Sequence, residues 1–201
     1  MRNALFFIVL LITFKTSAQN NSKITFQKNR YELAVSYYKK ADFINAIDLF
    51  YMACKLIPDN EIGIESSKKV DVLRTILRDN IMVQALGTWK SVGDKPGWAI
   101  YKKEKVFDEF IEVTNMQILF YKKDKITQEQ KLTNTEDLVY YNGEDSDPSF
   151  SNIILSNGTI WHCAINNNSS ELHVINIAKK DENGIDKIQN NNAEEFYVKV
   201  K

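Results

Sequence analysis

Between residues 27 and 60, apolar and small residues recur every three or four positions, which is the spacing of one face of an α-helix. The pattern includes Leu33, Ala34 and Tyr37, stops near Asp42, and resumes in a second segment. An Asp at position 42 can accept a hydrogen bond from the first turn of a helix, and Pro58 has no amide hydrogen with which to continue one. The window therefore predicts two antiparallel helices joined by a short turn.

The expected interface between these helices has small residues at its centre. Ala34 and Ala46 stand where the two helices would cross closely, and Tyr37 and Phe50 would fill the space beside them. The residues assigned to helix packing are Leu33, Ala34, Tyr37, Ala46, Phe50, Ala53 and Pro58. Their spacing resembles one full tetratricopeptide repeat. An ordinary helical hairpin is the alternative interpretation.

The resemblance has two departures, since the family often has Trp where this chain has Arg30 and Gly where it has Ala41. It implies that the hairpin recognises a protein or peptide partner and performs no chemistry. A single hairpin of this kind cannot bury its own apolar side, because such arrays need about three repeats for stability. We expect residues 61–83 to form a capping helix, and the wall of the β-structure that follows to cover the rest. The stripe predicted for this helix is Ile64, Val70, Leu73, Ile76 and Leu77.

The first eighteen residues have the pattern of a secretory signal peptide. Arg2 gives a positive start, an apolar run follows from Leu5 to Phe14, and small residues end at Ala18. The run is too short to cross a bilayer core of about 30 Å. We therefore expect cleavage after Ala18 and export to the periplasm or beyond, with an uncleaved N-terminal anchor as the alternative. No later segment is apolar enough to span a membrane, and the chain resembles exported proteins of Bacteroidota.

Removal of residues 1–18 leaves 24 basic and 26 acidic residues, a formal charge of −2. Because nucleic-acid binding needs a basic face, this balance argues against nucleic acid as the main partner. The composition changes near residue 83, from helix formers to β-branched and aromatic residues. The expected organisation is a signal peptide (1–18), a helical domain (19–83) and a β domain (84–201), which together make an α+β protein.

Short segments of β character follow one another closely in the second half of the chain. They cover residues 86–92, 98–103, 106–114, 116–122, 125–133, 136–142, 150–156, 159–166, 171–179 and 194–200. This spacing predicts an antiparallel β-barrel of about eight to ten short strands. Asn157-Gly158 predicts a hairpin with a two-residue turn, which would place Ile154 opposite Trp161 and Ile153 opposite His162.

The segment Gly87-Thr88-Trp89, followed by short strands and a closing strand at 194–200, resembles the calycin group of lipocalins and intracellular fatty-acid-binding proteins. The resemblance implies that Trp89 plugs the closed end of a barrel, beneath Lys199 or Lys201 of the last strand. The residues assigned to barrel closure or a possible ligand cavity are Gly87, Trp89, Phe150, Ile154, Trp161 and Ile165.

A calycin-like barrel implies a second function, the carriage of a small apolar ligand. The β domain contains no arginine, since the last one is Arg78. Fatty-acid carriers of this group hold the ligand carboxylate with a buried arginine, so its absence disfavours a fatty acid. A small barrel filled by its own side chains is the competing interpretation.

No set of residues predicts a catalytic or metal site. His162 and His173 fall on neighbouring predicted strands without further ligands nearby, and no nucleophile elbow is present. The acidic run 142–147 is interpreted as a solvated turn, with calcium binding as the alternative. Cys54 and Cys163 form either a disulfide or two free thiols. We therefore expect no cofactor and no metal, and a non-catalytic binding protein.

Overall fold

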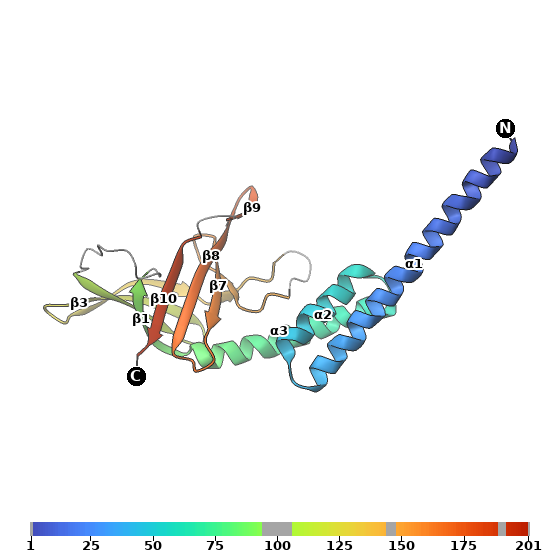
Figure 1. Cartoon of the computed structure of the whole chain (residues 1–201). Coiled ribbons are helices and arrows are strands. Elements are labelled where there is room, and N and C mark those ends of the chain that lie inside the picture. Colours follow the sequence, from blue (N-terminus) through green and yellow to red (C-terminus); the bar gives the residue numbers. More distant parts are fainter. Residues whose placement is uncertain (1, 94–105, 144–147, 189–191, 201) are drawn as a thin grey trace, which may run out of the picture. The chain divides into compact units, whose positions relative to one another are not determined.

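The structure is a computed structural model that describes residues 2–93, 106–143, 148–188 and 192–200, with the backbone alone for residues 2–20. Three helices come first: α1 (Arg2–Lys39), α2 (Phe43–Leu56) and α3 (Glu61–Ala85) (Figure 1). The strands that follow are β1 (Gly87–Gly93), β2 (Phe107–Val113), β3 (Gln117–Asp124), β4 (Gln130–Asp137), β5 (Val139–Tyr140), β6 (Asn152–Ile154), β7 (Thr159–Ile165), β8 (Glu171–Asp181), β9 (Gly184–Lys187) and β10 (Glu194–Lys199). The chain is therefore α+β. The predicted strand 98–103, residues 144–147 of the acidic run and Lys201 lie outside the described residues.

The chain divides into two compact units, and the division falls inside α3 between Leu77 and Arg78. Residues 1–77 belong to the helical unit. Residues 78–142 and 149–201 belong to the sheet unit. The last turns of α3 therefore pack with the sheet, although they continue a helix that begins in the helical unit.

The predicted helical hairpin consists of the C-terminal part of α1 together with α2, which run antiparallel (Figure 1). Asp42 caps α2, as predicted, and its carboxylate accepts a hydrogen bond from the Asn45 amide at 3.3 Å. The preceding Ala41 has φ = +58°, a left-handed conformation that favours Gly. The helix α2 ends at Leu56, and Pro58 lies exposed in the turn that follows.

The core of the helical unit is formed by side chains from all three helices. Ala34 and Ala46 are fully buried, so nothing larger than a methyl group separates the helices there. The buried apolar residues are Ala34, Ala46, Ile47, Phe50, Ala53, Cys54, Val70, Leu73 and Leu77. Tyr37 is half-buried.

Besides Pro58, two residues that the pattern assigns to packing lie at the surface. Leu33 is 42% exposed, and Ile64 on α3 is 49% exposed. Helical spacing identifies the apolar side of a helix, but burial also requires a second element to cover that side. Leu33 and Ile64 each lie on a helix face that no described residue of the helical unit covers.

The start of α3 packs against the end of α2 with no room for a side chain. A Cβ atom at Gly63 would lie 2.1 Å from the carbonyl oxygen of Ile57 and 2.6 Å from that of Pro58. Asn60 caps α3, because its side-chain oxygen accepts a hydrogen bond from the Gly63 amide at 2.8 Å. Gly63 therefore allows the first turn of α3 to approach the backbone at the end of α2 this closely.

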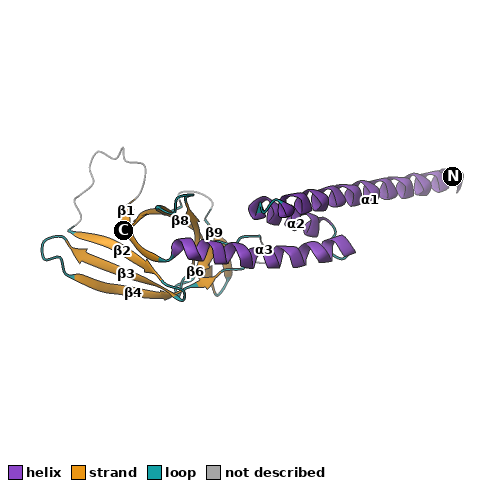
Figure 2. Cartoon of the chain, turned by 90° about the horizontal axis from the view of Figure 1, so that it is seen from below, coloured by secondary structure: helices purple, strands orange, loops and turns teal. Residues whose placement is uncertain are grey.

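The sheet unit is built around one curved antiparallel sheet with the strand order β4-β3-β2-β1-β10-β8-β7-β6-β5, and β9 pairs with β8. The first strand, β1, pairs with β2 on one side and with the last strand, β10, on the other. Figure 2 shows the end of α3 on the concave side of the sheet. Within the described residues, the edge strands β4 and β5 share no ladder, so the sheet is not closed into the barrel that the sequence predicts.

A side-chain contact joins the two ends of the open sheet. The carboxylate of Glu136 on β4 accepts hydrogen bonds from the amide and the hydroxyl of Ser156, at 2.7 and 3.0 Å. Ser156 follows β6, and Asn134 donates a third hydrogen bond to Glu136 at 3.0 Å. Because β5 is only two residues long, a side chain takes the place of a strand ladder here.

Glu136 makes the stability of the sheet unit dependent on pH. Burial alone would raise the pKa of this carboxyl, but the hydrogen bonds from Ser156 and Asn134 outweigh burial and hold the pKa below its ordinary value. A lowered pKa in the folded state stabilises the protein above the ordinary value of about 4.3, and this stabilisation disappears as the pH falls through the folded value. We expect Glu136→Gln to lower the free energy of unfolding at pH 6 by about 1 to 3 kcal/mol.

Urea unfolding of wild type and Glu136→Gln at pH 6 and at pH 3 measures this effect. The difference in the free energy of unfolding between the two proteins should be smaller at pH 3, because the stabilisation from a lowered pKa is lost as the pH falls below the ordinary value. Glu182→Gln, which changes an exposed carboxylate after β8, is the control and should match wild type at both pH values. If the free energies of unfolding of the two proteins differed equally at both pH values, the charge of Glu136 would contribute nothing to stability.

The hairpin between β6 and β7 differs from the predicted one by one residue. Ile153 pairs with Trp161 and Ile154 pairs with Ile160, because three residues separate Leu155 from Thr159. Gly158 alone takes the left-handed conformation there, at φ = +83°, which fits a three-residue loop better than the two-residue turn that Asn-Gly usually forms. A shift of one residue exchanges the two faces of a strand, so Ile153, not Ile154, faces the inside with Trp161.

Candidate functional site

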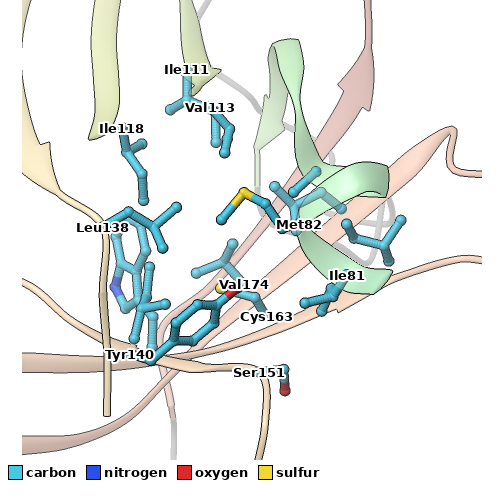
Figure 3. A pocket seen from close by; sticks show the side chains of 15 residues that line it. Ile81, Met82, Ile111, Val113, Ile118, Leu138, Tyr140, Ser151, Cys163 and Val174 are labelled. Atoms are coloured by element: carbon cyan, nitrogen blue, oxygen red, sulfur yellow. The ribbon is translucent and has the colours of Figure 1, made fainter. Parts of the chain in front are cut away.

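An apolar cavity lies between the concave face of the sheet and the last turns of α3. Figure 3 shows Met82 pointing from the helix into the space between strand residues such as Val113, Leu138 and Val174. Trp161, Cys163 and Ile165 of β7 also line it. Among the described lining residues, the polar side-chain groups are the hydroxyls of Ser151 and Tyr140, the thiol of Cys163 and the indole N–H of Trp161.

The size of this cavity limits what it can hold. Its volume is about 50 Å³, whereas pockets for drug-sized ligands measure roughly 300 to 1,000 Å³. The end of α3 supplies Ile81, Met82 and Ala85 to its wall, and so fills space that an open calycin-like interior would leave to a ligand. The interior therefore resembles a packed core more than a carrier site.

Trp89 connects the sheet to the end of α3. The ring is fully buried, and its indole N–H donates a hydrogen bond to the carbonyl of Ala85 at 2.7 Å. Lys199 of β10 lies over the ring at 4.9 Å and donates to the carbonyl of Gln84 at 2.8 Å. The expected cation–π pair is thus formed by Lys199. Both residues satisfy carbonyls at the negative end of the helix, where a cation is favourable.

The other residues assigned to barrel closure lie in different places. Gly87 has φ = +113°, which lets the chain turn from α3 into β1. Trp161 and Ile165 line the apolar cavity. Phe150 is half-buried before β6, and its carbonyl accepts a hydrogen bond from Arg78 at 3.4 Å. Ile154 lies on the opposite strand face and does not line the cavity, so its assignment is corrected together with the hairpin register.

A serine and a histidine meet at the edge of this region, which sequence spacing did not predict. Ser151 Oγ lies 3.2 Å from His162 Nδ1, and Asn152 Oδ1 lies 2.9 Å from the same nitrogen. The pKa of His162 is lowered, mainly by burial and secondly by the nearby His173, so the imidazole is neutral at pH 7. When Nδ1 donates to Asn152, it cannot accept the serine proton. In that tautomer, His162 satisfies the buried polar side chain of Asn152 and does not activate Ser151 as a nucleophile.

The remaining candidates for chemistry are also held in structural contacts. His173 stacks on Phe196 with ring centres 4.1 Å apart, and its Nε2 lies 2.9 Å from a Glu194 oxygen. Cys54 and Cys163 are both free thiols, and burial raises the pKa of Cys163 to about 12, which leaves it protonated and unreactive. Within the described part of the chain, no three or more His, Cys, Asp or Glu side chains gather to hold a metal ion.

The helical unit carries an open groove of about 640 Å³ along α3, which we call the α3 groove. Its described lining residues are Glu61, Ile64, Glu65, Lys68, Lys69 and Val72, which share one face of the helix. Ile64 is 49% exposed and Val72 is 51% exposed. Two exposed apolar side chains thus lie in the groove beside four charged ones.

Charge is distributed unevenly along the α3 groove. Glu61 and Glu65 lie toward the start of α3, whereas Lys68 and Lys69 follow one turn later. Two tyrosines of α1 contact these charged side chains. The pKa of Tyr31 is raised by burial and next by a hydrogen bond with Glu65. The Lys69 ammonium lies over the ring of Tyr38, 5.2 Å from its centre. The groove therefore has an acidic end and a basic end, with apolar side chains at both.

No protein-family model, no curated protein and no solved structure matches this chain. The likeness to tetratricopeptide repeats and to calycins therefore depends on the residues described above. Within the described residues, no helix combines the length and the apolar character needed to cross a membrane.

Proposed function

We propose that this chain is an exported, non-catalytic binding protein. Its helical unit contains one tetratricopeptide-like hairpin and recognises a peptide or protein segment, and its sheet unit is a lipocalin-like scaffold. The observation that carries the proposal is the contrast between the two units. The α3 groove is open and lined by exposed Ile64 and Val72, whereas the apolar interior of the sheet unit has a volume of only about 50 Å³.

Two features support the tetratricopeptide-like part of the proposal. Ala34, Ala46, Phe50 and Ala53 are fully buried at the positions where the repeat packs its helices. Ala41, which stands where the family often has Gly, takes the left-handed conformation that Gly favours. The lipocalin-like part is supported by Trp89 beneath Lys199 and by the pairing of the first strand with the last.

The chemistry of the groove defines the partner. The ligand is a peptide segment with two apolar side chains, a basic residue facing Glu61 and Glu65, and an acidic residue facing Lys68 and Lys69. A partner with the reverse charge order would place like charges together and bind more weakly. Carriage of a small apolar ligand is disfavoured, because the cavity of about 50 Å³ is several-fold smaller than such ligands need.

A phage-displayed peptide library selected against residues 19–201 tests the proposal. The double variant Ile64→Glu/Val72→Glu serves for counter-selection, so that only peptides that depend on the groove are kept. We expect selected peptides to carry the stated charge order and to lose about tenfold or more in affinity for the double variant. Met52→Glu changes another exposed apolar residue, at 50% exposure on α2, and should bind as wild type does.

Circular dichroism and thermal melting show whether each variant is folded, so loss of binding can be assigned to the groove. Peptides that bind wild type and the double variant equally would contradict the proposed recognition site. So would a selection that yields peptides dependent on Met52 and not on Ile64.

A further inference from the structure

The sheet unit contains a second cavity, which is larger and more polar than the apolar one. It has a volume of about 210 Å³ and lies on the inner face of the sheet. It shares Ile111 and Trp161 with the apolar cavity. Residues of β1, β2, β3, β4, β7 and β10 line it, and those used below are Phe120, Trp161, Tyr197, Glu109, Glu195 and Lys122. We call it the aromatic–acidic cavity.

Five of its described lining residues are aromatic, among them Phe120, Trp161 and Tyr197. Phe120 and Trp161 meet edge to face with their ring centres 6.1 Å apart. Tyr197 is only 4% exposed, and its hydroxyl donates a hydrogen bond to a carboxylate oxygen of Glu195. None of the described Lys or Arg side chains lies over the ring of Trp161. An indole face on a concave wall is the strongest aromatic partner that proteins offer to a cation.

The charges on the lining have the sign that complements these rings. Glu109 and Glu195 contribute two negative charges, and Lys122 contributes one positive charge. The Lys122 ammonium lies 3.6 Å from Glu109 Oε1, so its charge is directed at that carboxylate. Glu195 Oε2 accepts from Tyr197, whereas Glu195 Oε1 accepts no hydrogen bond from the described residues. The lining is therefore net negative, and one carboxylate oxygen is available to a ligand.

From this combination we infer that the aromatic–acidic cavity binds a small organic cation. The positive group lies against the ring of Trp161 and is neutralised by Glu195, and its alkyl groups contact Phe120 and Ile111. An engineered cavity of about 150 Å³ admits benzene, so a volume of 210 Å³ suits an alkylammonium ion of similar or slightly larger size. No arginine is among the described residues that line the cavity, so no guanidinium group there would favour an anion instead.

Isothermal titration calorimetry on residues 19–201 tests the inference with choline and with n-butylammonium. Each cation is compared with its neutral counterpart, 3,3-dimethylbutan-1-ol and butan-1-ol. We expect saturable binding of at least one cation, about tenfold tighter than its neutral counterpart, because only the cation gains from the indole face and the carboxylate. Equal binding of the neutral counterparts, or no saturable binding of either cation, would overturn the inference.

Two variants locate the bound cation. Glu195→Gln keeps an acceptor for the Tyr197 hydroxyl and removes the charge, and Trp161→Leu removes the indole face. Each should weaken binding about tenfold. Glu129→Gln removes an exposed carboxylate between β3 and β4 and should leave the affinity unchanged. Cation binding that survives both Glu195→Gln and Trp161→Leu, in variants with wild-type circular dichroism, would place the ligand elsewhere and overturn the assignment.

Discussion

Replacing Trp89 with alanine is expected to lower the free energy of unfolding of the sheet unit by about 3 to 5 kcal/mol. The ring is fully buried in the core of that unit, beside Ile111 and Tyr197. Its loss opens a cavity, and it also removes the hydrogen bond to the Ala85 carbonyl and the partner of the Lys199 ammonium. The end of α3 would then lose part of its attachment to the sheet.

Urea unfolding followed by near-ultraviolet circular dichroism measures this effect. Val92→Ala on the same strand is the matched control, since Val92 is 41% exposed and should cost less than about 0.5 kcal/mol. An unchanged unfolding midpoint for Trp89→Ala would show that the ring is not part of the core.

Replacing Gln27 with leucine is expected to destabilise the helical unit by about 2 to 4 kcal/mol, since several buried polar groups lose their partner at once. Gln27 is fully buried, and its side-chain amide donates to the carbonyls of Ala53 and Ile57, both at 2.9 Å. It also exchanges hydrogen bonds with Asn60, at 3.1 and 2.6 Å. One side chain thus joins α1 to the end of α2 and to the cap of α3.

A leucine has nearly the same volume as glutamine, so the loss reports on hydrogen bonds more than on packing. Lys28→Ala changes the adjacent exposed residue and is the control, which should melt within a few degrees of wild type. If Gln27→Leu were as stable as wild type, the polar contacts at this helix junction would contribute no net stability.

Helical spacing predicted the hairpin of α1 and α2, including the cap at Asp42, because both depend on residues close in sequence. The exposure of Leu33 and Ile64 was not predictable, since it depends on which helix faces remain uncovered after packing. Gln27 was missed for a related reason. A glutamine within a helix has the appearance of a surface residue until the carbonyls at the end of another helix are brought to it.

In the sheet, several predicted segments overlap observed strands, but β9 was not predicted and the segment 136–142 covers the end of β4 and the separate strand β5. The segment predicted as a strand from 125 begins with a turn, because Asp124 accepts hydrogen bonds from the amides of Ile126 and Thr127, at 2.8 and 2.9 Å. The strand β4 therefore starts at Gln130. The loop at Gly158 is one residue longer than predicted, which shifts the pairing of β6 with β7 by one residue. This error matters more than the late start of β4, because it exchanges Ile153 and Ile154 between the two faces of the sheet.

The candidate cavity could be predicted only in part. Trp89 and Lys199 were expected to meet from the resemblance to calycins, and they do. The volume of the interior depends on how far Met82 and Ile81 of α3 reach into the sheet, which no spacing in the sequence encodes. The aromatic–acidic cavity joins residues of six strands, so predicting it requires the complete strand order.

The proposed recognition site is tested most directly by nuclear magnetic resonance of ¹⁵N-labelled residues 19–201, titrated with a peptide from the phage selection. Binding in the α3 groove predicts concentration-dependent shift changes at amides between Glu61 and Val72, and none at those amides in Ile64→Glu/Val72→Glu. Shift changes confined to the strands of the sheet unit would contradict the proposal that the helical unit binds the partner.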